Sequence, residues 1–123
     1  MIWLSVAIGG ALGACLRYAL YISVPTLAGL PVGTFVANAL GSFLMGALAA
    51  WLRAEDAWES PLRLVLMVGV LGALTTFSTF ALEAVDALRA GRVSLAMAYV
   101  VVTVLVTVTG CWIGYILGQS LGR

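Results

Sequence analysis

The sequence contains no histidine and very little charge. Of its 123 residues 9% are charged and 63% are hydrophobic, whereas about a quarter of a soluble globular domain is charged. Without histidine there is no imidazole metal site and no histidine proton relay. The two cysteines, Cys15 and Cys111, fall inside apolar stretches and make no disulfide framework. A chain this apolar would expose large patches in water, so we expect an all-α integral membrane protein, neither an enzyme nor a partner of nucleic acid.

The charged residues divide the chain into four apolar stretches, and a bilayer-crossing helix needs about 20 residues. The stretches are residues 2–23, 32–53, 62–88 and 93–119. Turn-forming residues such as Pro25, Gly29 and Pro61 separate them. The first stretch is not typical of a signal peptide, because it lacks a basic start and contains Arg17. We therefore expect a single four-helix domain, multi-pass in the cytoplasmic membrane, with the lipid bilayer around it.

The arginines give the chain almost no preferred orientation. Four helices place both ends on one side of the membrane. The arginines expected on that side are Arg53, Arg63 and Arg123, and those on the other are Arg89 and Arg92, with Arg17 if it reaches outward. Because an excess of basic residues sets orientation, either the insertion machinery alone decides it or the chain inserts both ways up. We favour the second interpretation, with antiparallel pairing of two copies.

Small residues recur at a spacing of four, which lets helix backbones approach closely. The last helix has Gly110, Gly114, Gly118 and Gly122, and the first has Gly9 and Gly13. The pattern predicts a tightly packed bundle. It is compatible with packing inside one chain or between chains.

The third helix carries an unusual polar block near its centre. Gly69 and Gly72 precede "TTFSTF", residues 75–80, which places four hydroxyls within five positions. Single hydroxyls usually bond back to their own helix, but this density beside glycines favours a broken helix. Non-helical backbone at that depth is tolerated only where protein or a polar cavity covers it, and broken helices are where transporters bind ions.

Two kinds of side chain in these blocks suit a polar path. Asn38 either joins two helices or faces the path, and both interpretations remain open. Phe77 and Phe80 are three residues apart and share a face if the helix resumes. An aromatic ring has a positive edge and a negative face, so edge-on rings favour an anion and face-on rings a cation.

Charges are missing where a coupled transporter would need them. No acid, lysine or histidine is expected in the middle of any helix, although a proton-coupled exporter would normally keep a carboxylate there. Arg17 either extends to the interface or attracts anions to a vestibule. Glu83, Asp86 and Arg89 are interpreted as interfacial charges with a local pair. An uncoupled channel fits this pattern better than an exporter.

Three blocks, "GGALGACLRY", "GTFVANALGSFLMG" and "GVLGALTTFSTFALE", resemble the signature blocks of the fluoride ion channels called Fluc or CrcB. Block order, spacing, chain length and helix number agree over most of the chain, and the last helix matches in character. One departure is Ala73, where the family often has a second glycine.

The resemblance implies a fluoride-selective channel for passive efflux that lowers cytoplasmic fluoride, built as an antiparallel dual-topology homodimer with two pores. It implies that Asn38 donates to fluoride and that Phe77 and Phe80 present ring edges to it. The further pore residues it implies are Thr34, Ser78 and Thr79 as a polar track, Glu83 near a pore mouth and Arg17 from the first block. On the last helix, Thr103 and Thr107 could also face the pore.

The resemblance also implies a structural sodium ion on the dimer axis, at the break in the third helix. Its ligands would be the backbone carbonyls of Gly72 and Thr75 from each subunit. Hard oxygen ligands of this kind suit such a cation.

Two other functions fit parts of the sequence. A small dual-topology four-helix multidrug/proton antiporter has a similar length, but it requires a membrane-embedded carboxylate in the first helix, which has none. A non-transporting assembly subunit would explain the glycine faces but not "TTFSTF".

Overall fold

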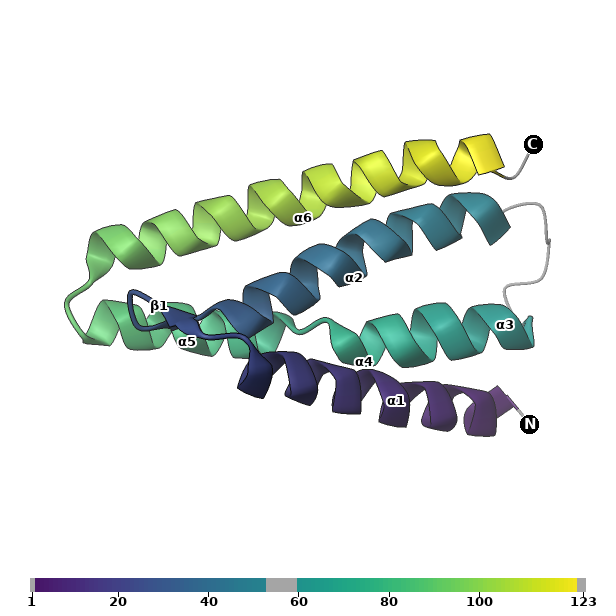
Figure 1. Cartoon of the computed structure of the whole chain (residues 1–123), viewed down its shortest axis with the longest axis horizontal. Coiled ribbons are helices and arrows are strands. Elements are labelled where there is room, and N and C mark those ends of the chain that lie inside the picture. The colour runs from purple at the N-terminus through teal and green to yellow at the C-terminus, as the bar shows by residue number, and fades with distance from the viewer. Residues whose placement is uncertain (1, 53–59, 122–123) are drawn as a thin grey trace.

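The computed structural model describes residues 2–52 and 60–121 and is almost entirely helical (Figure 1). Four helical segments are long and apolar enough to cross a membrane, which confirms the expected all-α membrane architecture. They are α1 (Ile2–Ser23), α2 (Val32–Trp51), the segment Pro61–Arg89 and α6 (Val93–Leu121). Each lies within two residues of its expected bounds. Arg53, Gly122 and Arg123 lie outside the described residues.

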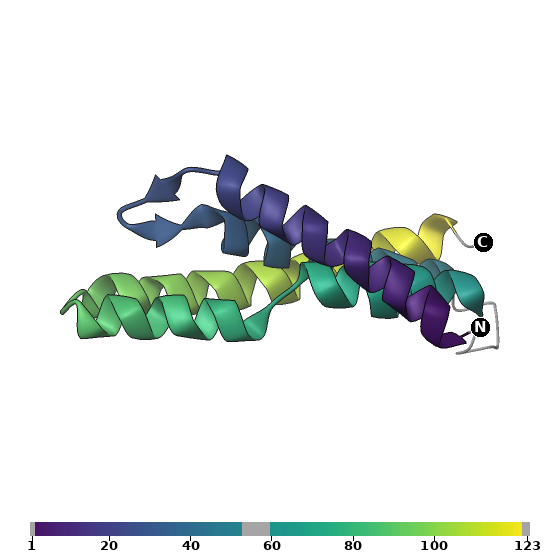
Figure 2. The same cartoon turned by 90° about the horizontal axis from the view of Figure 1, so that it is seen from below.

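The third span is broken, as the sequence predicts. It consists of α3 (Pro61–Arg63), the π-helical η2 (Leu64–Leu71), α4 (Gly72–Leu74) and α5 (Phe77–Arg89). Thr75 and Thr76 lie between α4 and α5 with extended backbone, with ψ of 148° and 117°. Figure 2 shows the two halves joined by this thin connection. The break therefore divides one span into two shorter helices, and both new ends lie inside the bundle.

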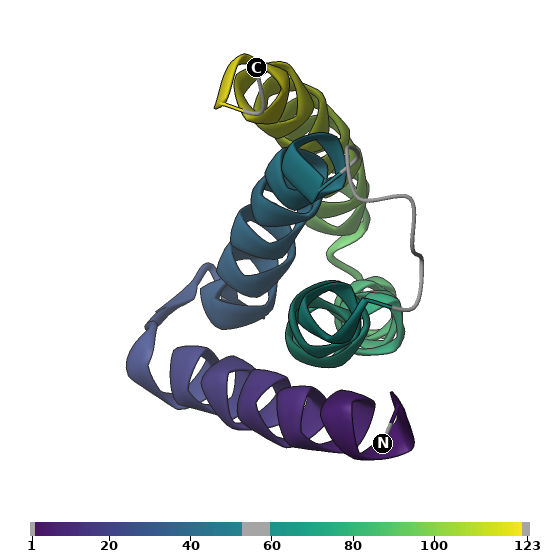
Figure 3. The same cartoon turned by 90° about the vertical axis from the view of Figure 1, so that its right-hand side faces the viewer.

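Glycines set the distances between helices, because no side chain would fit at the contacts. A Cβ atom on Gly46 of α2 would collide with the Cys111 carbonyl of α6, and one on Gly114 of α6 would collide with the Phe43 carbonyl of α2. On the other side of the bundle, a Cβ atom on Gly13 of α1 would collide with the backbone of η2. The end-on view in Figure 3 shows α2 against α6, and α1 beside the third span. The spacing of four therefore serves packing within the chain.

A small hairpin joins α1 to α2, where the sequence indicates only a turn. Strand β1 (Thr26–Leu27) pairs with the antiparallel strand β2 (Leu30–Pro31). The two residues between them have positive φ, 51° at Ala28 and 80° at Gly29, which is the conformation that tight two-residue hairpins require. Arg92, just before α6, donates from Nη1 to the Ala28 carbonyl at 2.7 Å. This bond ties the hairpin to the turn between α5 and α6.

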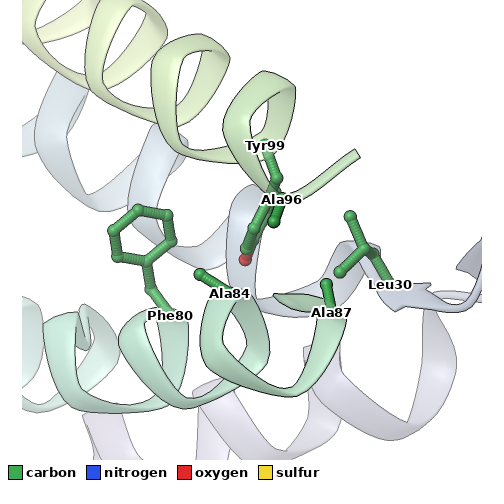
Figure 4. Close-up of a cluster of buried hydrophobic side chains, with 6 residues drawn as sticks. All are labelled: Leu30, Phe80, Ala84, Ala87, Ala96 and Tyr99. Atoms are coloured by element: carbon green, nitrogen blue, oxygen red, sulfur yellow. The ribbon is translucent and has the colours of Figure 1, made fainter. Parts of the chain in front are cut away.

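A buried cluster holds the hairpin, α5 and α6 together (Figure 4). Its members come from all three elements: Leu30, Phe80, Ala84, Ala87, Ala96 and Tyr99. The three alanines let α5 and α6 lie close to each other, and the two aromatic rings fill the space toward the break. This packing fixes the face that α5 turns toward α2 and α6.

Candidate functional site

The break frees backbone groups that a continuous helix would satisfy, and Asn38 of α2 takes up two of them. In an unbroken helix the Thr76 N–H would donate to the Gly72 carbonyl. It donates instead to Oδ1 of Asn38 at 2.7 Å, and Nδ2 of Asn38 donates to the Thr76 carbonyl at 3.0 Å. Of the two Asn38 interpretations, the structure shows the bond between segments. The side-chain amide of Asn38 has two N–H donors, and the bond to the Thr76 carbonyl uses one of them. Donation of the other N–H to an anion stays a prediction.

The hydroxyls of the block behave in two ways. Thr75 follows the ordinary pattern, because its hydroxyl donates back to the Leu71 carbonyl at 2.9 Å. Thr76 caps α5, its Oγ1 accepting from the Thr79 N–H at 3.2 Å. The same Oγ1 bonds the Thr79 hydroxyl at 3.1 Å and the Ser78 hydroxyl at 3.2 Å. The predicted track residues Ser78 and Thr79 therefore converge at the positive end of the α5 helix dipole, which favours anions.

Three aromatic rings continue from this point along α5 and onto α6. The ring centres of Phe77 and Phe80 are 5.5 Å apart and tilted by 60°, and those of Phe80 and Tyr99 are 5.2 Å apart and tilted by 56°. Phe80 is 5% exposed, whereas Phe77 is 77% exposed. The expectation that the two phenylalanines share a face is confirmed, and within one chain the outer ring remains uncovered.

Glu83 differs from its interpretation as an interfacial charge. It is 8% exposed, and both its oxygens accept hydrogen bonds of 2.6 Å, one from the Thr34 hydroxyl and one from the Tyr99 hydroxyl. The expectation that no helix interior holds an acid is therefore wrong. The physical reason is the face that Glu83 occupies, because that side of α5 packs against α2 and α6, whose Thr34 and Tyr99 bond the carboxyl group.

The predicted pair between Asp86 and Arg89 is absent. Both side chains are exposed, and neither has an ion-pair partner among residues 2–52 and 60–121. Only the interfacial part of that interpretation holds.

Two cavities flank the break. One, of about 310 Å³, is lined by Ala14, Arg17, Tyr18, Tyr21, Thr34, Thr76 and Thr79, and we call it the arginine cavity. The other, of about 320 Å³, is lined by Asn38, Ser42, Thr75, Thr76, Phe77, Phe80, Thr103, Val104, Thr107 and Val108, and we call it the phenylalanine cavity. Thr76 lines both. Six of the predicted pore residues therefore line the two cavities, with Arg17, Thr34 and Thr79 in the first and Asn38, Phe77 and Phe80 in the second. The exposed Ser78 and the buried Glu83 line neither.

Two threonines of α6 have different roles in the phenylalanine cavity. The Thr107 hydroxyl donates to the Thr103 carbonyl of its own helix at 2.8 Å. The Thr103 hydroxyl is buried and has no hydrogen-bond partner in the described part of the chain, although the residue is only 4% exposed. A buried hydroxyl without a partner costs about 1–3 kcal/mol. It is therefore a polar group of this cavity wall that the described part of the chain leaves unsatisfied.

Tyr99 is the site residue that sequence reasoning missed. Its ring contacts Phe80 and its hydroxyl bonds Glu83. The available signal was spacing, because Tyr99, Thr103 and Thr107 are four residues apart and so lie on one face of α6.

The proposed sodium ligands lie at the break itself. Gly72 keeps a helical backbone (φ −62°, ψ −34°), and Thr75 is extended (φ −80°, ψ 148°). The described residues contain no group of three or more acids or cysteines that could hold a metal. The oxygen atoms at the break are backbone carbonyls and the hydroxyls of Thr75 and Thr76.

Comparison with known proteins identifies relatives over nearly the whole chain. Residues 4–115 match the family model described as CrcB-like protein, Camphor Resistance (CrcB). A protein of Novosphingobium aromaticivorans is 46% identical over 113 residues, 89% of each chain. One of Saccharophagus degradans is 41% identical over 98% of this chain and 92% of its own. One of Thermus thermophilus is 42% identical over 97% and 94%. All three are named fluoride-specific ion channel FluC, and this chain belongs to the CrcB family.

Proposed function

We propose that this protein is a fluoride channel of the inner membrane, through which fluoride leaves the cytoplasm passively. The observation that carries the proposal is the phenylalanine cavity. It brings the hydroxyl of Thr103, which has no partner among residues 2–52 and 60–121, together with the Asn38 amide and the rings of Phe77 and Phe80. Hydroxyls, an amide and aromatic edges can replace the hydration shell of a small anion. The relatives' names point to the same ion.

The two cavities give an anion successive contacts on either side of the break. Arg17 gives the arginine cavity a positive charge, and Thr79 supplies a hydroxyl beside it, whereas the O–H of Thr34 is donated to Glu83. Thr76 lines both this cavity and the phenylalanine cavity, so the two lie on either side of it. Among the described residues, none that lines either cavity is acidic. An anion therefore meets donors and positive ring edges along this route. Glu83 lines neither cavity, and its carboxyl group is bonded to Thr34 and Tyr99.

We also propose that two chains pair antiparallel. Phe77 exposes 77% of its surface although it borders the phenylalanine cavity, so a second chain at this face would complete the cavity wall. The nearly equal arginine counts of the two sides support insertion in both orientations.

The test of dual topology is thiol labelling of Ala90→Cys, in the exposed turn after α5, after Cys15 and Cys111 are replaced. An impermeant reagent applied to intact cells should label about half the chains, and labelling of all or none excludes dual topology.

A structural sodium ion at the break is proposed on the same basis. The Gly72 carbonyl lacks its helical donor because the Thr76 N–H is bonded to Asn38, and Thr75 is extended beside it. Carbonyl oxygens of this kind suit a hard cation, and such an ion would hold the break in place when bound. Exchange of sodium for a large organic cation should lower the unfolding temperature. An unchanged unfolding temperature would contradict the site.

Growth in fluoride tests the cellular role. Expression of the chain in a bacterium without its own fluoride export should restore growth in millimolar fluoride. Failure of a correctly inserted chain to do so would contradict efflux. The alternative of a multidrug/proton antiporter has no support among these relatives, each of which is named a fluoride-specific channel.

A further inference from the structure

An apolar groove lies apart from the two cavities at the break. It has a volume of about 300 Å³ and runs between the hairpin with the start of α2 on one side and the first turns of α6 on the other. Its walls include Leu30 and Phe35 on one side and Leu95, Ala98 and Val102 on the other. The remaining wall residues are also apolar, apart from the ring of Tyr99. The groove therefore suits a hydrocarbon, and it offers nothing that would recognise a polar solute.

The groove has a direction that matches the membrane. Leu95, Ala98 and Val102 follow one another at spacings of three and four residues, so they line one face of α6. At a rise of about 1.5 Å per residue they cover about 10 Å of depth. The outer end is the hairpin, where the α5–α6 turn and its arginines also lie (Figure 1). A chain lying in the groove would therefore enter the bilayer from the interface, as a lipid tail does.

A positive charge stands at the outer end of the groove. Arg92 donates one N–H, from Nη1, to the carbonyl of Ala28, a residue of the groove wall. A guanidinium has five N–H donors, and no carboxylate among the described residues pairs with it. Basic pockets between transmembrane helices at the membrane surface bind the head groups of anionic lipids. The charge and the apolar groove together form a site that suits a ligand with an anionic head group and a hydrocarbon tail.

We propose that this groove binds one acyl chain of an anionic phospholipid, whose phosphate contacts Arg92. The hairpin and α6 hold the tail between Leu30 and Ala98, and the free N–H groups of Arg92 hold the phosphate. The site is complete within one chain, so each chain binds one such lipid. Its wall shares no residue with the two cavities at the break, and Tyr99 is the wall residue that also contacts Phe80 and Glu83.

Native mass spectrometry of the full chain, with phosphatidylglycerol and phosphatidylcholine of identical tails, tests this site. Wild-type protein should retain one tightly held phosphatidylglycerol per chain and prefer it about fivefold, the effect of one arginine beside an anionic head group. Arg92→Gln keeps a donor for Ala28 but should lose this preference. Arg89→Gln, which changes an exposed arginine outside the groove wall, should keep it.

A second pair of variants tests the tail. Ala98→Trp fills the groove and should abolish retention of the lipid, whereas Val101→Trp, on an exposed part of α6 outside the groove wall, should retain it.

Equal retention of the two lipids by wild-type protein would overturn the anionic head group. Equal retention by the two tryptophan variants would overturn the groove. Loss of dimer in Ala98→Trp, with no lipid held by wild-type protein, would show that a second copy fills it. The arginine variants decide the question if Ala98→Trp does not fold.

Discussion

Asn38 and Thr76 exchange two hydrogen bonds across the break, of 2.7 Å and 3.0 Å, so that one side chain satisfies both backbone groups of one residue. Both residues are buried, at 8% and 7% exposure. A buried polar group left without a partner costs about 1–3 kcal/mol. The extended backbone between α4 and α5 is therefore stable because α2 supplies the asparagine.

Asn38→Asp should disrupt this exchange. A carboxylate has no N–H to donate to the Thr76 carbonyl, so the free energy of unfolding should fall by about 1–3 kcal/mol, and fluoride flux should be lost because a negative charge repels the anion. Unfolding in detergent and vesicle efflux measure the two effects. Ser120→Ala, which removes an exposed hydroxyl bonded to its own helix, is the control. Wild-type flux in Asn38→Asp would show that Asn38 does not face the path.

Thr103→Val should separate conduction from stability. The substitution keeps the shape and removes a buried hydroxyl that has no partner among the described residues, so the free energy of unfolding should stay the same or rise. Fluoride flux should fall about tenfold, the effect of one lost hydrogen bond of about 1.4 kcal/mol to a charged group. Thr107→Val is the matched control, because that hydroxyl bonds its own helix. Wild-type flux in Thr103→Val would remove Thr103 from the path.

The two phenylalanines should respond differently to isoleucine. Both Phe77→Ile and Phe80→Ile should reduce fluoride flux, because each removes a positive ring edge. Only Phe80→Ile should also lower the free energy of unfolding of one chain, by about 1–3 kcal/mol, since Phe80 is 5% exposed and Phe77 is 77% exposed. Flux per folded protein is the measurement, with Leu82→Ile on the exposed part of α5 as control. Undiminished flux in both phenylalanine variants would exclude the ring-edge mechanism.

Tyr99→Phe tests the anchoring of Glu83. It removes one of two hydroxyl donors to a buried carboxyl group, so the free energy of unfolding should fall by about 1–3 kcal/mol. Combined with Thr34→Val, it should give a non-additive effect of about 0.5–3 kcal/mol, because both donors serve the same acceptor. Tyr18→Phe, on an exposed ring, controls for loss of a hydroxyl. Strict additivity of the two changes would show that Glu83 is held in some other way.

The four spans and the break were predictable from the sequence because each has a local cause. Apolar length gives the spans, and hydroxyls beside Gly72 indicate the break. The tight glycine contacts followed from their spacing, although the sequence did not say that Gly46 and Gly114 would meet inside one chain.

The missed features depend on which face a residue presents, and that is a property of the packed bundle. Glu83 was interpreted as interfacial because it lies near the end of a long span, but the break makes it central in α5. Tyr99 has no unusual neighbours along the chain, and its role follows from α6 lying against α5. The hydrogen bond from Arg92 to the hairpin carbonyl of Ala28 likewise joins residues that are far apart in the sequence.

Ion release from liposomes holding the purified protein tests the central claim most directly. The vesicles contain equal fluoride and chloride, a potassium ionophore prevents a voltage from stopping the flow, and electrodes follow both anions. The account predicts fast fluoride release with little chloride release, and a clear reduction in Thr103→Val measured alongside. No fluoride release from correctly folded protein, or release of both anions at the same rate, would contradict it.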